Sequence, residues 1–489
     1  MPDSTRSSLT LAEGLSREFL LHRLFTPRRY AEDGTLVVAA AEEALLDDVD
    51  ELSFLYRAPI ALERASREEV EQLIERLANA SGQALELRAD PDAGDDFTTD
   101  ARNLASQPPV IRYVNLLVRE AYDAGASDIH LEATRTGLTT RFRLDGVLSP
   151  APEPPAGLQL AVVSRVKLLA QLDIAERRRP QDGRIRVRME ARELDLRVST
   201  VPTMYGESVV LRLLERGGRP VGLEELGLDP ETLDALARLA DRPHGMILAT
   251  GPTGSGKTTT LYAALSRRNA AEQKIITVED PIEYQLPGIT QVPVHREAGT
   301  SFATVLRSIL RQDPDVLMIG EMRDGETAEL AVQSAMTGHL VFSTLHTNDA
   351  VGAIPRLLDL GVPAYLAAAT LEGVLAQRLV RRICPDCRKA GRASPEAVAA
   401  LAGQAVDVEL FRGAGCRACR GTGFRSRVGL FELLRVTDPV RDAIARGAAH
   451  AELRKLAVVE GMRPLRRDGW RKVLAGITTV EEVLRVVEA

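Results

Sequence analysis

One ten-residue stretch limits the fold of this chain more than any other. Residues 251–260 read GPTGSGKTTT and fit the pattern G-x-x-x-x-G-K-[ST]. The apolar run GMILAT precedes this stretch, and the helix-forming run TTTLYAALSRR overlaps its end. In a strand, loop and helix of this kind, the backbone N–H groups of the loop and the N-terminus of the helix bind phosphate. The stretch therefore predicts a nucleotide-binding loop; the alternative is a glycine-rich turn that binds nothing.

The motif assigns a role to each part of the predicted loop. Lys257 is expected to reach the β- and γ-phosphates, and Thr258 is expected to ligate Mg²⁺. ATP and Mg²⁺ are therefore the expected cofactors. The full set of expected nucleotide-binding residues is Gly251, Pro252, Thr253, Gly254, Ser255, Gly256, Lys257 and Thr258.

Three more short apolar runs follow the loop, and polar residues come directly after each of them. The runs are KIITV, DVLMIG and LVFST. Nearly continuous apolar strands that alternate with helices indicate a parallel sheet covered on both faces. Residues 223–383 are therefore expected to form an α/β nucleotide-binding core. Ligands bind at the carboxyl ends of the strands in such a sheet.

The polar residues that follow these three runs are candidates for catalysis. Glu321 is the candidate for the carboxylate that orients and activates the attacking water. Glu279 is expected to help hold Mg²⁺ or the same water. His346 either senses the γ-phosphate or is a structural histidine. Each residue alone could be a solvated loop residue, but on one edge with the phosphate loop they indicate a nucleotide site.

The four cysteines of the chain form two pairs. Cys384 and Cys387 lie in ICPDC, and Cys416 and Cys419 lie in CRAC. Two C-x-x-C turns joined by a loop suit one tetrahedral four-cysteine Zn²⁺ site. A redox-active C-x-x-C or unpaired buried thiols are the alternatives. A disulfide framework is not expected in a chain of 489 residues with four cysteines.

The rest of the chain divides by its pattern into further segments. Residues 1–90 are expected to form a small α/β module, residues 91–109 a polar linker, and residues 110–222 an α+β domain. The four-cysteine segment covers residues 384–425, and residues 426–489 are expected to be helical. In the module, the helix REEVEQLIERLANA places one apolar face inward, formed by Val70, Leu73, Ile74 and Leu77.

The α+β domain has an arginine-rich sheet face. In strands, neighbouring side chains point to opposite faces. Ile185 and Val187 are therefore expected to point inward, while the intervening and flanking arginines point outward. On these residues alone, a solvated face is the favoured interpretation. The arginines are Arg184, Arg186 and Arg188, with Arg197 on a following strand.

Composition limits the function classes. The net charge of −7 argues against bulk electrostatic binding of nucleic acid. We find no secretory signal and no uncharged apolar run of eighteen residues, so a cytoplasmic protein is expected, with membrane association through a partner or a surface patch. Local basic clusters at 177–188, 378–389 and 463–472 are expected to be solvated faces or subunit contacts, and an acidic lipid surface is a further option.

Taken together, the motifs resemble those of the secretion and type IV pilus ATPases. GPTGSGKT, TVEDPIEY, LMIGEMRD and TGHLVFSTLHTNDA match the motor domain of that family. GASDIHLEA, RRRPQDGR and LRVSTVPTMYGESVVLRLL match the family's second N-terminal domain. The similarity runs in order over residues 108–489. Met322 replaces the isoleucine that is common in the family.

The resemblance implies a RecA-like motor that works as a homo-oligomer, expected to be a hexamer. It carries catalytic roles onto Glu321, Glu279, Lys257 and His346. It also implies that two strand arginines of the preceding domain approach the phosphates, here Arg197 and Arg212. A planar guanidinium suits the charge on transferring phosphoryl oxygens. Arg141 and Arg143 are weaker candidates.

The cysteine segment and the short N-terminal module point to one branch of the family. Retraction ATPases lack the four-cysteine segment, and extension ATPases have a longer N-terminal region. The chain is therefore expected to resemble the type II secretion ATPases, the general secretory pathway protein E family. That resemblance implies pseudopilus assembly, export of folded proteins and docking of the module on the cytoplasmic domain of an inner-membrane platform protein. Pilus extension or DNA-uptake assembly is the alternative; a zinc-containing nucleic-acid translocase is a remote one.

Overall fold

The computed structural model describes three stretches of the chain. These are residues 20–80 with gaps at 22, 32, 43, 45–48 and 57; residues 108–216 with gaps at 155–156 and 190–191; and residues 221–487 with gaps at 269, 295–299, 405 and 407. The chain divides into two compact units, residues 1–142 with 149–214 and residues 143–148 with 215–489. The predicted linker at 91–109 lies outside the described residues except for its last two, which begin a helix.

The N-terminal module is a small α/β fold. Its sheet has the order β1-β2-β3, with β1 and β2 antiparallel and β2 and β3 parallel. Val70, Ile74 and Leu77 of α3 are buried and Leu73 is partly buried, which confirms the predicted apolar face. The described elements are β1 (Phe25–Tyr30), β2 (Leu36–Ala40), α2 (Val49–Tyr56), β3 (Ile60–Arg64) and α3 (Arg67–Ala80).

Residues 108–216 form the predicted α+β domain around a six-stranded sheet in the order β6-β5-β4-β9-β8-β7. Ile185 and Val187 are buried and Arg184 and Arg186 are exposed, so the predicted alternation is confirmed there. The elements are α5 (Pro108–Asp123), β4 (Ala126–Thr134), β5 (Gly137–Leu144), β6 (Val147–Pro150), α6 (Gln159–Leu169), β7 (Gln181–Met189), β8 (Arg192–Thr203) and β9 (Gly206–Arg216).

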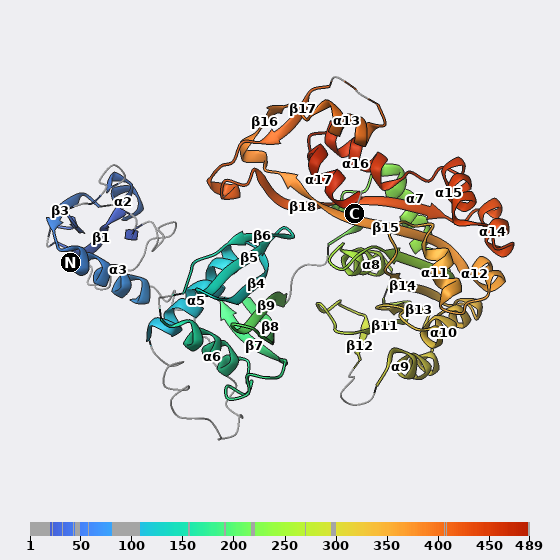
Figure 1. The fold of residues 1–489 in the computed structure, drawn as a ribbon, viewed down its shortest axis with the longest axis horizontal. Coiled ribbons are helices and arrows are strands. Elements are labelled where there is room, and N and C mark those ends of the chain that lie inside the picture. The colour runs from blue at the N-terminus through green and yellow to red at the C-terminus, as the bar shows by residue number, and fades with distance from the viewer. Residues whose placement is uncertain are drawn as a thin grey trace. The chain divides into compact units, whose positions relative to one another are not determined.

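The motor domain is built on a seven-stranded sheet in the order β12-β11-β13-β14-β10-β15-β18 (Figure 1). All neighbouring pairs are parallel except β15 with β18. The four apolar runs of the sequence are four of these strands. The strands are β10 (Gly245–Thr250), β11 (Ile275–Glu279), β12 (Thr290–Pro293), β13 (Val316–Ile319), β14 (Leu340–Leu345), β15 (Leu371–Ile383) and β18 (Phe424–Arg435).

Each face of this sheet is covered by helices. Met246 and Leu248 of β10 pack in one apolar cluster with helices α9–α12, whereas Ile247 and Ala249 pack in a second with α7 and α8. Alternate strand residues therefore feed two cores, as expected for a sheet buried on both faces. The helices are α7 (Pro230–Ala240), α8 (Lys257–Ser266), α9 (Phe302–Ile309), α10 (Gly325–Met336), α11 (Ala353–Asp359) and α12 (Ala364–Thr370).

The long antiparallel pair of β15 and β18 corrects the expected domain boundaries. Residues 426–489 were predicted to be helical, yet residues 424–435 form the edge strand of the motor sheet. The prediction failed because the partner strand is distant in sequence and both strands contain charged residues that are buried in the fold. The helices that follow are α14 (Asp438–Ala445), α15 (His450–Val459), α16 (Leu465–Leu474) and α17 (Val480–Val487).

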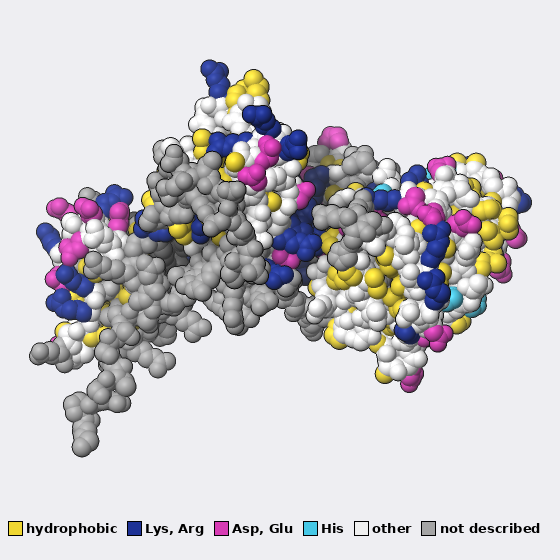
Figure 2. Space-filling model, turned by 90° about the horizontal axis from the view of Figure 1, so that it is seen from below, with side chains coloured by type: hydrophobic (Ala, Val, Ile, Leu, Met, Phe, Trp, Pro, Cys, Tyr) yellow, Lys and Arg dark blue, Asp and Glu magenta, His cyan; other side chains and the backbone are white. Residues whose placement is uncertain are grey.

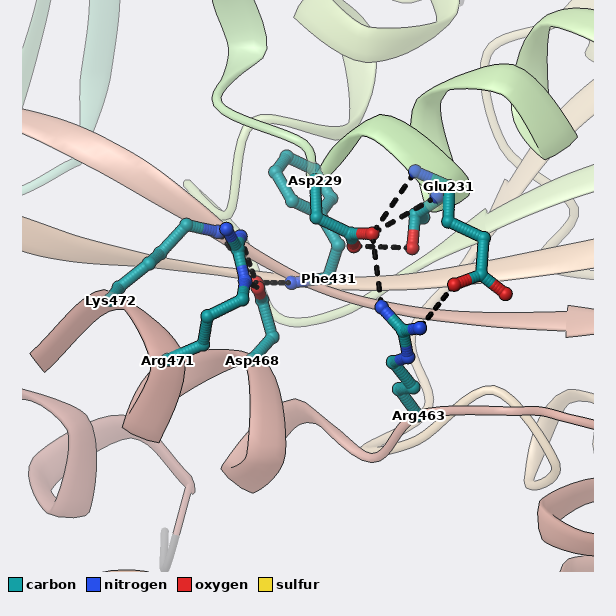
Figure 3. A network of polar contacts seen from close by, with 8 residues as sticks. Asp229, Glu231, Phe431, Arg463, Asp468, Arg471 and Lys472 are labelled. Carbon is teal, nitrogen blue, oxygen red and sulfur yellow. Dashed lines mark hydrogen bonds and ion pairs between the residues drawn. The ribbon is translucent and has the colours of Figure 1, made fainter. Parts of the chain in front are cut away.

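A polar network attaches these C-terminal helices to the start of the motor (Figure 3). Asp229 caps α7 by accepting from the backbone N–H groups of Glu231 and Thr232. Arg463 Nη1 lies 3.1 Å from Asp229 Oδ1, and Arg463 also pairs with Glu231. On α16, the buried Asp468 accepts from the backbone N–H of Phe431 at 3.0 Å and from Lys472 Nζ at 2.5 Å. The network ties α16 to β18, and it ties the segment just before α16 to α7.

Candidate active site

The phosphate loop lies between β10 and α8, as its sequence predicts. The loop has left-handed backbone at Gly254 and Gly256, where glycine is favoured. A Cβ atom added at Gly251 would lie 2.5 Å from the carbonyl oxygen of Gln377, so a larger residue does not fit there. The loop is thus held close against β15, and its backbone N–H groups lead into the N-terminus of α8.

Lys257 is folded back onto its own loop. Its Nζ atom donates to the carbonyl oxygens of Gly251 at 2.7 Å and Pro252 at 3.1 Å. Burial lowers the pKa of Lys257 to about 8, with Glu321 opposing and Arg378 adding to that effect. The ammonium group is therefore incompletely compensated, a state that phosphate oxygens would relieve.

Glu321 stands just beyond the end of β13 and makes two contacts with candidate site residues. Its Oε1 atom lies 2.6 Å from Arg323 Nε, and its Oε2 atom lies 3.6 Å from His346 Nε2. The Glu321 side chain is 13% exposed. Burial and the charge of Lys257 lower the pKa of His346, although Glu321 opposes this. His346 is therefore neutral at neutral pH, and Arg323 is a cation in direct contact with Glu321.

Glu279 is the last residue of β11, which is the neighbour of β13 in the sheet. Its carboxylate has different surroundings from that of Glu321. It is 3% exposed. It accepts hydrogen bonds from Tyr262 of α8, from Thr277 Oγ1 at 2.5 Å and from Gln291 Nε2 at 3.2 Å. Burial raises the pKa of Glu279 despite these donors. The carboxylate thus holds α8 to the sheet, and its hydrogen bonds come from Tyr262, Thr277 and Gln291, not from the candidate residues Lys257 and His346.

The loop after β14 is tied to the end of β10. Thr347 N donates to Thr250 Oγ1 at 2.8 Å, and the two hydroxyl oxygens lie 2.7 Å apart. Thr250 directly precedes the phosphate loop, and Thr347 directly follows His346. Hydrogen bonds between short side chains at these positions fix the spacing of the two loops.

Two candidate arginines lie in the α+β domain. Arg212 of β9 pairs with the buried Asp128 of β4, with Nε 2.9 Å from Oδ1. Burial alone would raise the pKa of Asp128, but hydrogen bonds from Arg212 and Ser127 outweigh it and the pKa is lowered. Arg197 of β8 lies opposite Arg184 of β7 in the strand register. Arg141 is occupied differently, with Glu132 accepting twice from its guanidinium.

The four cysteines meet at one point, near the ends of β15 and β18. Their Sγ atoms all lie within 4.8 Å of one another. The Sγ separations are 3.8 Å for Cys384 and Cys416, 3.8 Å for Cys387 and Cys419, and 3.6 Å for Cys416 and Cys419. Four thiolates around Zn²⁺ at about 2.3 Å stand roughly 3.8 Å apart. The cluster therefore fits a tetrahedral metal site, and all four cysteines are free of disulfides.

Backbone N–H groups favour the thiolate form of one cysteine in this cluster. The N–H groups of Cys416 and Gly423 donate to Cys419 Sγ at 3.1 and 3.3 Å. Burial alone would raise the pKa of Cys419, but these donors lower it to about 6. A thiolate is the metal-binding form of cysteine.

Sequence reasoning missed several residues that shape the site. Tyr262 and Gln291 surround Glu279, and Gln377 and Arg378 of β15 contact the two loops. For Gln377 and Arg378, the sequence feature that could have indicated a role is the presence of two polar residues inside the apolar run of β15. Without the strand register, that run reads as an amphipathic helix.

Comparison with known proteins agrees with this geometry. Residues 103–485 match the family described as "Type II/IV secretion system protein". Type II secretion system protein E of Xanthomonas campestris pv. campestris is 47% identical over 99% of this chain and 87% of that protein. Type IV pilus assembly ATPase PilB of Myxococcus xanthus is 44% identical over 92% of this chain and 82% of that protein.

Solved structures show the same fold. The pilus retraction motor PilT with bound ADP has a TM-score of 0.50 and 28% identity, covering 76% of this chain and 95% of that one. The Legionella pneumophila ATPase DotB has a TM-score of 0.57 and 20% identity, covering 82% and 99%. With its phosphate loop and the Glu321 cluster at one sheet edge, the chain belongs to the type II/IV secretion ATPase family.

Proposed function

We propose that this chain is the ATP-hydrolysing motor of a type II secretion system. It would drive assembly of a pseudopilus and so the export of folded proteins. The observation that carries the proposal is that one motor domain contains both a phosphate loop and Glu321. The chain is also 47% identical to a type II secretion system protein E over nearly its whole length. That match includes the N-terminal module, where pilus and secretion ATPases are expected to differ.

Binding of ATP begins at the phosphate loop. Lys257 would exchange the carbonyl oxygens of Gly251 and Pro252 for phosphate oxygens, which are stronger acceptors for an ammonium group. The N–H groups of the loop and the N-terminus of α8 would bind the same phosphates. Thr258, the second residue of α8, is the proposed protein ligand of Mg²⁺, which neutralises charge on the β- and γ-phosphates.

Glu321 is the proposed carboxylate for the attacking water. Its partial exposure leaves it accessible, and its carboxylate oxygens, one of which contacts Arg323, are hydrogen-bond acceptors. Neutral His346 beside it can contact the γ-phosphate region or position the carboxylate. Glu279 takes part in our proposal as a support for Mg²⁺ or the water, acting from its buried place against α8.

Arg197 and Arg212 are proposed to complete the site as arginine fingers from the α+β domain. A guanidinium released from its carboxylate partner would stabilise charge on the transferred phosphoryl group. Arg212 is 58% exposed in spite of its ion pair with Asp128, so its remaining donors face solvent. A homo-hexamer is the assembly that we propose for such shared sites.

The cysteine cluster is proposed to hold Zn²⁺ with a structural role. All four positions of a tetrahedral ion would be filled by protein thiolates, which leaves no position for a substrate. The short separations of the four sulfur atoms support this proposal. When bound, the ion would crosslink the two C-x-x-C turns and stabilise a segment with few buried apolar residues.

The N-terminal module is proposed to dock on the cytoplasmic domain of an inner-membrane platform protein. Among the described residues, no helix is long and apolar enough to cross a membrane. The proposal also makes the chain a cytoplasmic protein that is peripheral on the inner membrane and contacts acidic lipid through its basic clusters.

Sequence identity and charge bear differently on the two alternative functions. Pilus extension is favoured by the 44% identity with PilB, which is only slightly lower than the identity with the secretion proteins. A nucleic-acid translocase is disfavoured by the net charge of −7. On the part of the motor at the right of Figure 2, acidic and basic side chains are interspersed.

The test uses the full chain in its secretion host. The wild-type chain is expected to hydrolyse ATP, to restore export in a strain that lacks it, and to recover a secretion platform protein in a pull-down. Recovery of a pilus platform protein would select the extension alternative. ATPase activity that rises on DNA addition and falls steeply with salt would select the translocase.

A further inference from the structure

Two consecutive polar residues are buried in β15 beside the phosphate loop. Thr250 and Ala376 are the last paired residues of β10 and β15, so β15 continues alongside the loop where β10 stops. The next residues of β15 are Gln377, which is 2% exposed, and Arg378, which is 6% exposed. Burying an amide and a guanidinium is costly unless both are hydrogen-bonded. Their contacts therefore indicate what they do.

Gln377 joins the phosphate loop to helix α8. Its Nε2 atom donates to the carbonyl oxygen of Ser255 at 2.7 Å, and its Oε1 atom accepts from Thr260 Oγ1 at 2.7 Å. A Cβ atom added at Gly256 would lie 2.6 Å from Gln377 Nε2. The amide thus fits tightly under the turn where the loop becomes the helix. Its two bonds fix the direction of the backbone that must bind phosphate.

Arg378 joins the same strand to the loop that carries His346. Its Nη1 atom donates to the carbonyl oxygen of Gln377 at 3.1 Å, and its Nη2 atom donates to the carbonyl oxygen of Asn348 at 2.8 Å. Nη1 would also lie 3.1 Å from a Cβ atom at Gly251. The planar guanidinium therefore joins β15, beside Gly251 of the phosphate loop, to the loop that carries His346, a reach that two fixed donors allow.

We propose that Gln377 and Arg378 are positioning residues of the ATPase site. Gln377 sets the shape of the phosphate loop for nucleotide binding, and Arg378 sets the position of the His346 loop relative to it for the chemical step. The inference rests on the proposed ATPase function. It assigns separate effects to two adjacent residues, which a general role in packing would not produce.

The first test measures Mg·ADP binding with a fluorescent ADP analogue. Gln377→Met keeps the side-chain length but removes both hydrogen bonds, and we expect the Kd to rise about tenfold because two buried partners lose their bonds. Thr260→Val removes one of them, and we expect about threefold. Gln333→Met on α10 is the matched control, because the Gln333 side chain is exposed and donates to Glu329 of the same helix.

The second test separates Arg378 from Gln377 by steady-state kinetics. Arg378→Met is expected to lower kcat about tenfold while the Kd for Mg·ADP stays within about twofold. Arg378→Lys keeps the charge and one donor, so we expect it to recover part of kcat. Melting temperatures are recorded for each variant. If Gln377→Met does not fold, the Kd of Thr260→Val for Mg·ADP tests the role of Gln377, because that change replaces a hydroxyl by a methyl group and removes one Gln377 hydrogen bond.

The possible results separate this inference from the proposed function. A wild-type chain that neither binds Mg·ADP nor hydrolyses ATP contradicts the proposed function itself. An active wild-type chain whose Gln377→Met and Thr260→Val variants bind Mg·ADP as the control does contradicts the positioning role of Gln377. Equal losses of binding and turnover in the Arg378 and Gln377 variants contradict the division of roles.

Discussion

Glu279 is the last residue of β11 and Glu321 follows the neighbouring strand β13, but the two carboxylates occupy different environments. Glu321 is partly exposed and contacts Arg323 and His346. Glu279 is buried and accepts from Tyr262, Thr277 and Gln291. The two carboxylates are similar in sequence, since each directly follows an apolar run. The difference favours Glu321 as the carboxylate for chemistry with a substrate, whereas the hydrogen bonds of the buried Glu279 hold α8 to the sheet.

The largest effect is expected from Lys257, the residue of the phosphate loop that we propose to bind the nucleotide. Lys257→Ala removes the one charged side chain of GPTGSGKTTT, which we propose to pair with the β- and γ-phosphates, so kcat/KM for ATP is expected to fall about a thousandfold. Lys455→Ala, a change at an exposed lysine of α15, is the control. Phosphate release at several ATP concentrations measures both. Equal kinetics in the two variants would remove the phosphate loop from the mechanism.

Glu279→Gln tests the holding role directly. The amide retains an acceptor for Tyr262 but loses the charge, so we expect kcat to fall about tenfold, far less than for loss of a general base. Tyr262→Phe removes the hydroxyl donor to Glu279 and should cost about 1–2 kcal/mol of unfolding free energy. Thermal and urea unfolding measure the second effect. A thousandfold loss in Glu279→Gln would reverse the roles that we assign to the two carboxylates.

The pH dependence of binding tests the Lys257 environment. The pKa of Lys257 is lowered to about 8 in the free chain, and phosphate binding should raise it. Above pH 8 free Lys257 loses its proton and must regain it on binding, so affinity falls as pH rises. Between pH 7.5 and 8.5 we expect about a threefold weaker Kd for Mg·ADP. Calorimetry in two buffers of different ionisation enthalpy should show proton uptake, and Lys257→Met should lose it.

The smallest effect on the nucleotide site is expected from the cysteine cluster. Cys416→Ser should reduce bound metal from one ion per chain to well below one and lower the melting temperature. Mg·ADP affinity should remain within about twofold, because the four thiolates of a structural site leave no position for nucleotide. Elemental analysis of the purified chain measures the metal. A wild-type chain with no metal and four titratable thiols would contradict the zinc proposal.

Local patterns predicted the parts of the fold that depend on local information. The apolar runs predicted β10, β11, β13 and β14, and GPTGSGKTTT predicted the phosphate loop and the start of α8. Residues after these strands were correctly placed at one sheet edge. The two environments of Glu279 and Glu321 could not be predicted, because Tyr262 and Gln291 reach Glu279 only after the chain has folded.

Long-range pairing explains the other failures. β15 and β18 contain Arg378 and Glu432, which are buried, so neither strand shows the continuous apolar pattern of its neighbours. Glu432 accepts from the backbone N–H groups of Ala350 and Leu465, partners that are distant in sequence. Asp128 and Arg212 likewise meet only through the register of β4 with β9. Such contacts depend on the order and pairing of the strands, which cannot be predicted from a short segment of the sequence.

The most direct test of the central claim compares Glu321→Gln with the wild-type chain. The change keeps the size of the side chain and removes its ability to accept a proton. We predict that the Kd for Mg·ADP stays within about threefold while kcat for ATP hydrolysis falls at least about a hundredfold. A variant that binds Mg·ADP normally and hydrolyses ATP within about threefold of the wild-type rate would contradict the account.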